Sequence, residues 1–123
     1  MLKNFLNNTA PQDQTLKLYT SNTTPAEGDT AATYTEASGG GYAAKSLTGS
    51  SWTVSTAAGT TEGSYAQQTW TFTSVPGTPD MYGYFVVQTT SGILMWAERF
   101  TGAPYTIVNV NDQINVTPKI QAA

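Results

Sequence analysis

Apolar and polar residues alternate with a period of two along much of this chain. In residues 67–74, Trp70 and Phe72 fall on one side of the alternation and three threonines fall on the other. Successive side chains of a β-strand point to opposite faces, so this spacing predicts a strand that is buried on one face. The same reasoning predicts strands at 15–19, 42–46, 52–55, 81–88, 93–100, 106–110 and 113–118, with a further short strand at 32–35.

Turn residues separate these segments. Thr89–Gly92 lies between two of them and predicts a β-hairpin. Asn111 and Asp112 predict a second hairpin between 106–110 and 113–118, because both residue types tolerate positive φ. Gly39–Gly41 is expected to be a flexible turn and residues 57–63 a loop. Many short strands with regular turns are typical of an all-β fold, and we expect a single-domain antiparallel β-sandwich or jelly-roll-like barrel over residues 15–123.

Residues 1–14 are predicted to form an extended N-terminal arm. Leu2, Phe5 and Leu6 have helical spacing, but polar residues and Pro11 interrupt the segment directly afterwards. One amphipathic turn is not stable alone in water. These three apolar side chains therefore either fold back on their own domain or contact a neighbouring subunit or shell. No apolar run suits a signal peptide or a membrane span, which predicts synthesis in the cytoplasm.

The amino-acid composition excludes several kinds of functional site. The chain has 123 residues with neither cysteine nor histidine, which excludes disulfides, thiolate metal sites and the commonest general base. Its net charge is −3, from 5 Lys and Arg against 8 Asp and Glu. Nucleic acids and anionic membranes are bound by clustered cations, so we expect neither as a partner. We also expect no catalytic residues, no metal and no cofactor.

The acidic residues are candidates for catalytic or metal-binding groups. A glycosidase needs two carboxyl groups in one cleft, whereas nearly all of these acids fall in predicted loops. Glu27-Gly28-Asp29 lacks the spacing of a calcium loop. Glu98 and Arg99 are neighbours in a strand and face opposite sides, so we expect that they do not pair with each other. One of them is expected to be half-buried and paired elsewhere, or to face a partner subunit. The acids are Asp13, Glu27, Asp29, Glu36, Glu62, Asp80, Glu98 and Asp112.

Aromatic residues offer a second candidate site. Their rings can form a platform for sugars, but a sandwich core also needs large residues, and we expect the tryptophans in the core. The aromatic candidates are Trp52, Trp70, Trp96, Tyr82, Tyr84 and Tyr105.

Long parts of the chain carry no charge. Residues 46–61, 63–79 and 81–97 contain no Asp, Glu, Lys or Arg. Low charge promotes association, and an uncharged surface is suited to burial between subunits of a dense assembly.

Strand and turn segments follow one another in a distinctive order between residues 15 and 118. They are Leu16–Asn22 followed by Pro25, Tyr34–Glu36 leading to Gly41-Tyr42, Trp52, Trp70 with Phe72, Tyr82–Val87, Leu94–Phe100 and Ile114–Pro118. In this order the chain resembles small virion proteins of tailed bacteriophages and cyanophages. The resemblance implies a β-rich structural protein and brings no catalytic motif with it.

The role that this resemblance implies is capsid decoration or cement. Such a protein binds the outer shell and stabilises contacts between major capsid subunits without enzymatic activity. The implied partners are the major capsid protein and further copies of this chain in a homotrimer, at the capsid surface of the virion. The alternative is a tail, baseplate or fibre-associated protein that binds host-surface glycan, for which some tryptophans should be exposed. A small glycan hydrolase with two loop carboxylates is a further hypothesis.

Overall fold

Regular structure in the described residues consists of β-strands and two short 3₁₀ turns. The computed structural model describes residues 13–57 and 59–122. The elements are β1 (Gln14–Tyr19), η1 (Ala31–Thr33), β2 (Lys45–Leu47), η2 (Gly49–Ser51), β3 (Thr53–Ala57), β4 (Thr60–Ser64), β5 (Gln68–Thr71), β6 (Asp80–Met81), β7 (Gly83–Gln88), β8 (Leu94–Arg99), β9 (Tyr105–Thr106), β10 (Gln113–Val116) and β11 (Lys119–Ala122). All strand pairs among them are antiparallel. The predicted all-β, β-sandwich-like fold is therefore confirmed.

The largest sheet has the strand order β2-β1-β7-β8. β1 and β7 pair along their whole length, from Gln14 opposite Gln88 to Tyr19 opposite Gly83. β7 and β8 form the hairpin that the sequence predicts around Thr89–Gly92. Smaller sheets of two or three strands, β10-β5, β6-β9 and β11-β4-β3, make up the rest of the molecule.

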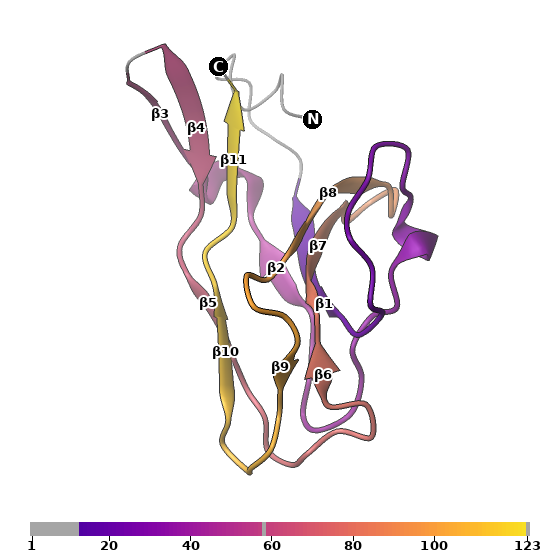
Figure 1. Ribbon diagram of the computed structural model, residues 1–123. Helices are drawn as coiled ribbons and strands as arrows, with labels where there is room; N and C mark the ends of the chain where they lie inside the picture. Colours follow the sequence, from indigo (N-terminus) through magenta and orange to yellow (C-terminus); the bar gives the residue numbers. More distant parts are fainter. Residues whose placement is uncertain (1–12, 58, 123) are drawn as a thin grey trace.

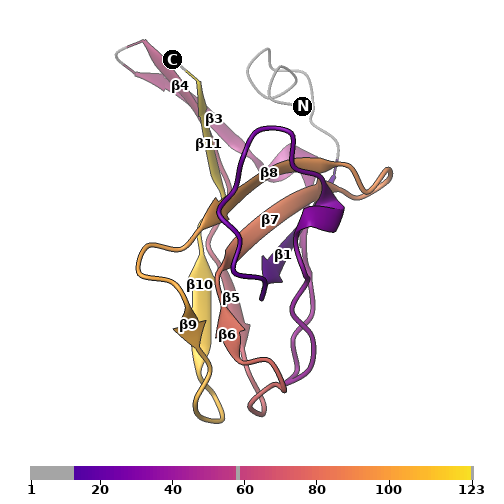
Figure 2. The same ribbon diagram turned by 45° about the vertical axis from the view of Figure 1, so that its right-hand side comes forward.

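The smaller sheets extend beyond the central one. β4 leads into β5 and β10 leads into β11, so the same two stretches of chain pair over two sheets. Figures 1 and 2 show β3, β4 and β11 projecting from the upper end of the molecule. The loop between β5 and β6 and the loop between β9 and β10 lie together at the lower end in both views.

The inner face of the central sheet packs on β5 and β10. Leu16, Leu18 and Val86 from the sheet are fully buried in one cluster with Trp70 and Phe72. The strand at 67–74 has the predicted alternation, because Trp70 and Phe72 are buried and its threonines are exposed. This cluster is the main hydrophobic core, and burial of its aliphatic and aromatic area is the dominant favourable term in folding.

The outer face of the central sheet is apolar as well. Tyr19, Tyr34, Phe85 and Val87 form a second buried cluster on this side. Tyr34 comes from residues 20–37, the segment that follows β1 and that we call the outer cover, and its ring stacks on Phe85 at 5.4 Å between centroids. Antiparallel sheets often leave one face in water, but this one has both faces covered.

Two sequence predictions about local structure are wrong. The strand expected at 32–35 is instead the 3₁₀ turn η1, inside the outer cover. The loop expected at 57–63 contains β4, which pairs with β3 on one side and β11 on the other. Its Thr, Glu and Gly residues lack a large apolar side chain to mark a buried face, so only pairing with its neighbours makes it a strand.

The second predicted hairpin is also wrong. β9 ends at Thr106 and pairs with β6, whereas β10 pairs with β5. Residues 107–112 between them form a loop, in which Asn111 has the positive φ that its residue type allows (72°). Alternation along a chain identifies a strand but not its partner, and here both partners come from distant segments.

The turn at Gly39–Gly41 is packed rather than flexible. All three residues have positive φ, and the Gly40 carbonyl accepts a hydrogen bond from Thr73 N–H at 2.8 Å. A side-chain carbon on Gly40 would lie 2.5 Å from the Ser74 carbonyl oxygen. Glycine is required there because the backbones approach so closely.

The N-terminal arm lies almost entirely outside the described residues. Leu2, Phe5 and Leu6 belong to residues 1–12, so their predicted contact with a shell or subunit stays a prediction. The described chain begins at Asp13, and β1 begins at Gln14, a residue that was expected in the arm and that is fully buried.

Candidate interaction surfaces

Most acidic side chains are hydrogen-bonded or ion-paired within the fold. Asp13 accepts from Gly49 N–H, Asp29 from Ala26 N–H and Tyr34, Glu36 from Tyr42, Asp80 from Thr106, Glu98 from Tyr84, and Asp112 from two backbone amides. Glu36 also pairs with Lys17, and Glu62 pairs with Lys119. Within residues 13–57 and 59–122, no three or more acidic groups lie close enough to hold a metal ion. These carboxylates stabilise turns and strand pairs.

Glu98 and Arg99 have different partners, as their adjacent positions in one strand predict. The Tyr84 hydroxyl donates to Glu98 Oε2 at 2.8 Å. The Arg99 guanidinium lies 5.2 Å from the centroid of the Tyr82 ring. Burial raises the pKa of Tyr84 above its ordinary value of 10.0, and the nearby Glu98 raises it further.

Two tyrosine–carboxylate hydrogen bonds involve the outer cover, one inside it and one between it and Tyr42. Tyr34 donates to Asp29 at 2.7 Å and Tyr42 donates to Glu36 at 2.9 Å. Burial raises the pKa of both tyrosines, and the adjacent carboxylates raise it further. Leu18 N–H donates to the Tyr42 hydroxyl, which acts in the opposite direction without reversing the shift.

The tryptophans do not form an exposed platform. Trp52 and Trp70 are buried in the core and Trp96 packs against it, which confirms the expectation for the first two. The exposed aromatic ring is Tyr105, 43% accessible, which stacks on Phe100 with centroids 4.7 Å apart. Its hydroxyl donates to the Thr101 carbonyl, so the ring is fixed with one face toward solvent.

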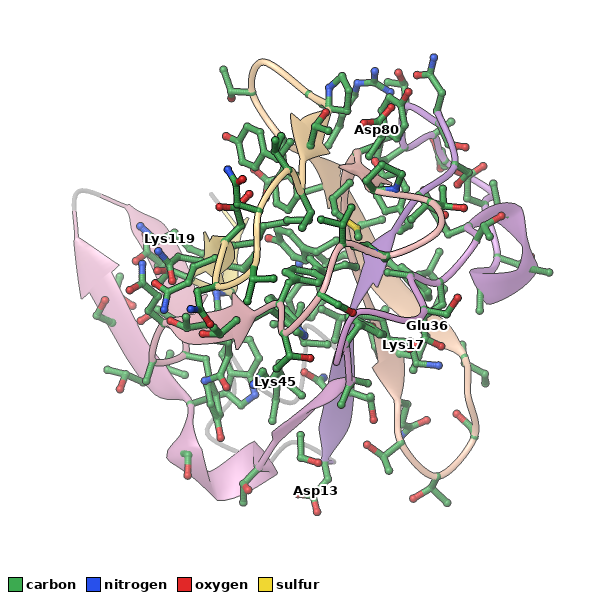
Figure 3. All side chains as sticks on the ribbon, turned by 90° about the horizontal axis from the view of Figure 1, so that it is seen from below. Asp13, Lys17, Glu36, Lys45, Asp80 and Lys119 are labelled. Carbon is green, nitrogen blue, oxygen red and sulfur yellow. The ribbon has the colours of Figure 1, made fainter. Side chains whose placement is uncertain are left out.

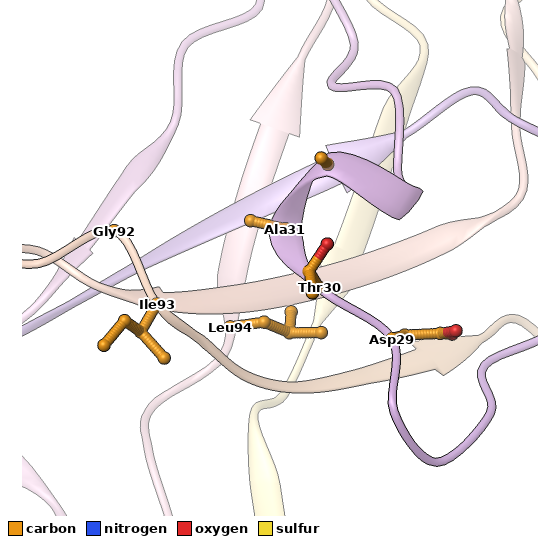
Figure 4. A pocket seen from close by; sticks show the side chains of 7 residues that line it. Asp29, Thr30, Ala31, Gly92, Ile93 and Leu94 are labelled. Atoms are coloured by element: carbon orange, nitrogen blue, oxygen red, sulfur yellow. The ribbon is translucent and has the colours of Figure 1, made fainter.

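An apolar hollow lies where the outer cover meets the β7–β8 hairpin. We call it the hairpin pocket; it has a volume of about 320 Å³ and is lined by residues 29–32 and 92–94. Figure 4 shows Ile93 and Leu94 of the hairpin next to Asp29, Thr30 and Ala31 of the cover. Ile93 is 59% exposed.

A β-bulge explains how Leu94 reaches the outer face. Val86 is opposite Trp96, whereas Val87 is opposite Leu94, so β8 carries one extra residue. Met95 and Trp96 both pack on the inner cluster as a result, while Leu94 packs on the outer one. Such a bulge redirects a side chain without ending the strand.

Three exposed valines lie on the two lower loops. Val75 (47% accessible) lies in the β5–β6 loop, and Val108 (64%) and Val110 (59%) lie in the β9–β10 loop. We call these three residues the valine end. Seen from this end, the labelled charged residues are spread around the molecule rather than gathered in one cluster (Figure 3). The two loops are side by side because Asn111 N–H donates to the Phe72 carbonyl and Phe72 N–H donates to the Asp112 carbonyl.

Asp112 fixes the conformation of the valine-bearing loop. Its carboxylate accepts from Val108 N–H at 2.8 Å and from Asn109 N–H at 2.9 Å. These two amide bonds lower the pKa of Asp112 below its ordinary value, because they favour the charged form. The polar groups of the loop are thus bonded to one another, and Val108 and Val110 remain in solvent.

Sequence reasoning missed this surface because it assigned Val108 and Val110 to a strand. The sequence did contain a signal for a turn: Asp112 follows Val108 by four residues and stands next to Asn111. Asp side chains commonly close turns by accepting hydrogen bonds from backbone amides. The exposure of Val75 in the neighbouring loop had no local signal.

Comparisons with known protein families, with curated proteins and with solved structures find no match for this chain. The described residues include no helix long and apolar enough to cross a membrane.

Proposed function

We propose that this protein is a non-enzymatic capsid decoration or cement protein of a tailed bacteriophage. The observation that carries the proposal is the valine end, an exposed apolar surface on loops that hydrogen bonds hold in one conformation. The resemblance in segment order adds the class of particle. The proposed partners are the major capsid protein and further copies of this chain in a homotrimer, at the outer surface of the virion.

The valine end has the properties of a binding surface. Three exposed aliphatic side chains on two neighbouring loops offer an apolar contact surface, and loops on a rigid scaffold are the usual place for binding residues. A loop already held by the Asp112 carboxylate loses little conformational freedom on binding. Each valine that becomes buried contributes about 1–2 kcal/mol, because only its exposed part, between 47% and 64%, is newly covered.

Repetition strengthens such a contact. A shell presents the same site many times, and linked sites can raise avidity by about 10²–10⁴ without any new kind of contact. The stretches at 46–61 and 63–79 carry no charge, so copies that meet through them bring no like charges together.

The first test is the copy number of the chain in purified particles of its own phage, by quantitative mass spectrometry against the major capsid protein. The proposal expects a number comparable with that of the major capsid protein. A small fraction of that number would indicate the tail or a vertex, and absence from the particle would overturn a virion role.

The second test separates the valine end from the rest of the surface. The double variant Val108→Ser/Val110→Ser should bind empty shells of the same phage about 100-fold more weakly, as the loss of two buried valines implies. Its melting temperature should not change, because both side chains are exposed in the free protein. Ile93→Ser is the matched control, since Ile93 is an equally exposed aliphatic residue elsewhere. Equal binding by both variants would contradict the proposal.

A second candidate is a tail, baseplate or fibre-associated protein that binds host-surface glycan. The observation that favours it is the exposed, fixed Tyr105 ring on Phe100, which offers a flat apolar face to a sugar. A glycan array with the wild type and Tyr105→Ala tests it. Binding that disappears in the variant supports this role, and an empty array contradicts it.

A further inference from the structure

The hairpin pocket is the part of the outer face that the outer cover leaves open. The outer cover seals Tyr19, Phe85 and Val87, but it leaves Ile93 59% exposed beside Leu94 and Ala31. The volume of about 320 Å³ is roughly ten times the share of one water molecule in the liquid. It is large enough for more than one aliphatic or aromatic side chain.

Residues 1–12 join the described chain next to this pocket. The Asp13 carbonyl accepts from Thr89 N–H at 3.1 Å, and its carboxylate accepts from Gly49 N–H. Asp13 is therefore held at the base of the β7–β8 turn. Gln14 pairs with Gln88, and Gln88 N–H donates to the Ile93 carbonyl. Two strand spacings, about 10 Å, thus separate the start of β1 from Ile93.

We propose that the hairpin pocket receives the apolar side chains of residues 1–12 of the same chain. Leu2, Phe5 and Leu6 are the large apolar residues of that segment together with Met1. The chain from Leu6 to Asp13 can span about 23 Å when extended, which exceeds the distance to be covered. The charges of the segment and the pocket are complementary as well. Lys3 is the charged residue of the segment, and Asp29 is the charged residue of the pocket lining.

The same chain is the favoured source because of effective concentration. A segment tethered by a short linker experiences a local concentration of about millimolar order at a site within its reach. A neighbouring copy reaches that level only in a dense assembly. The inference concerns the free protein and does not depend on the proposed capsid role.

Disulfide trapping tests the proposal, since the chain has no cysteine of its own. The full-length variant Leu6→Cys/Ile93→Cys is oxidised with oxidised glutathione at a concentration where light scattering shows a monomer. A disulfide requires the two Cα atoms to come within about 7 Å. We expect a monomer-sized, internally cross-linked product by non-reducing electrophoresis and mass spectrometry.

The matched control is Leu6→Cys/Val108→Cys, which places the second thiol at the valine end. It should cross-link much more slowly. A disulfide-linked dimer of the test variant would overturn the proposal, because the segment would then occupy a neighbour's pocket.

A second measurement does not depend on disulfide geometry. The rate of maleimide labelling is measured for Ile93→Cys in the full chain and in the same chain carrying Leu2→Ser, Phe5→Ser and Leu6→Ser. If the segment covers the pocket, the three substitutions raise the rate about tenfold, as a ten-to-one docked population implies. Labelling of Val75→Cys should not respond to them. Unchanged labelling of Ile93→Cys, with no internal cross-link, would overturn the proposal.

Discussion

The valine end and the hairpin pocket are both exposed apolar surfaces, but the fold builds them in opposite ways. Val108 and Val110 stand on a protruding loop whose polar groups bond to one another. Ile93 and Leu94 border a hollow that remains because the outer cover ends before the hairpin does. A protruding surface is accessible to another molecule, whereas a hollow close to Asp13 is within reach of residues 1–12.

Different hydrogen bonds hold the two surfaces in place. A carboxylate accepting backbone amides, that of Asp112, fixes the valine loop. Tyrosine hydroxyls donating to Asp29 and Glu36 fix the outer cover that borders the pocket. The first arrangement is sensitive to acid and the second to alkali, so the two surfaces can be perturbed separately.

The largest expected effect comes from Tyr34→Ala. The substitution removes a buried ring that stacks on Phe85 and contacts Tyr19 edge-on, and such changes typically cost about 3–5 kcal/mol. We expect a loss of this size in the free energy of unfolding by urea titration. The rate of hydrogen exchange should increase much more in residues 20–37 than in residues 107–112.

Tyr34→Phe is the control for this experiment. It keeps the ring contacts and removes only the hydrogen bond to Asp29, which is expected to cost about 1 kcal/mol. Equal acceleration of exchange at both surfaces in Tyr34→Ala would show that they are not independent.

An intermediate effect is expected from alkali. The pKa values of Tyr34 and Tyr42 are raised above 10.0 in the folded state. A raised pKa means that their contribution to stability is complete below pH 10 and is lost as the pH rises through the folded-state values. We expect the outer cover to loosen in this alkaline range. Tyrosinate absorbance and circular dichroism, recorded together during a pH titration, measure the change. If Tyr34→Phe leaves this alkaline transition unchanged, the cover is held by something other than this hydroxyl.

The smallest effect is expected from Asp112→Asn. The substitution removes the charge that the Val108 and Asn109 amides stabilise, so exchange at these amides should increase while the melting temperature hardly changes. In the wild type the lowered pKa means that the loop is fully held above pH 3.8, the ordinary value for Asp, and loosens as the pH falls through the lowered value. The variant should lack this acid dependence. Shell binding should fall several-fold, and binding equal to wild type would show that the valines need no fixed loop.

Some elements were predictable because their signal is local. Trp70 and Phe72 alternate with threonines, and the turn at Thr89–Gly92 interrupts two apolar segments, so a strand and a hairpin follow from neighbouring residues alone. β4 was missed because Thr60–Ser64 carries no apolar marker. The pairing of β9 and β10 was missed because their partners, β6 and β5, lie more than 20 residues away in the chain.

The sequence by itself determined the all-β class, the absence of cysteine and histidine chemistry, and the burial of Trp52 and Trp70. These follow from composition and from a period of two, which depend only on residue types and their spacing. The tertiary structure alone decided that the loop carrying Val75 lies beside the loop carrying Val108, and that Ile93 stays exposed next to the outer cover. Both depend on which distant strands pair and on where the cover folds back, and side-chain alternation carries no information about either.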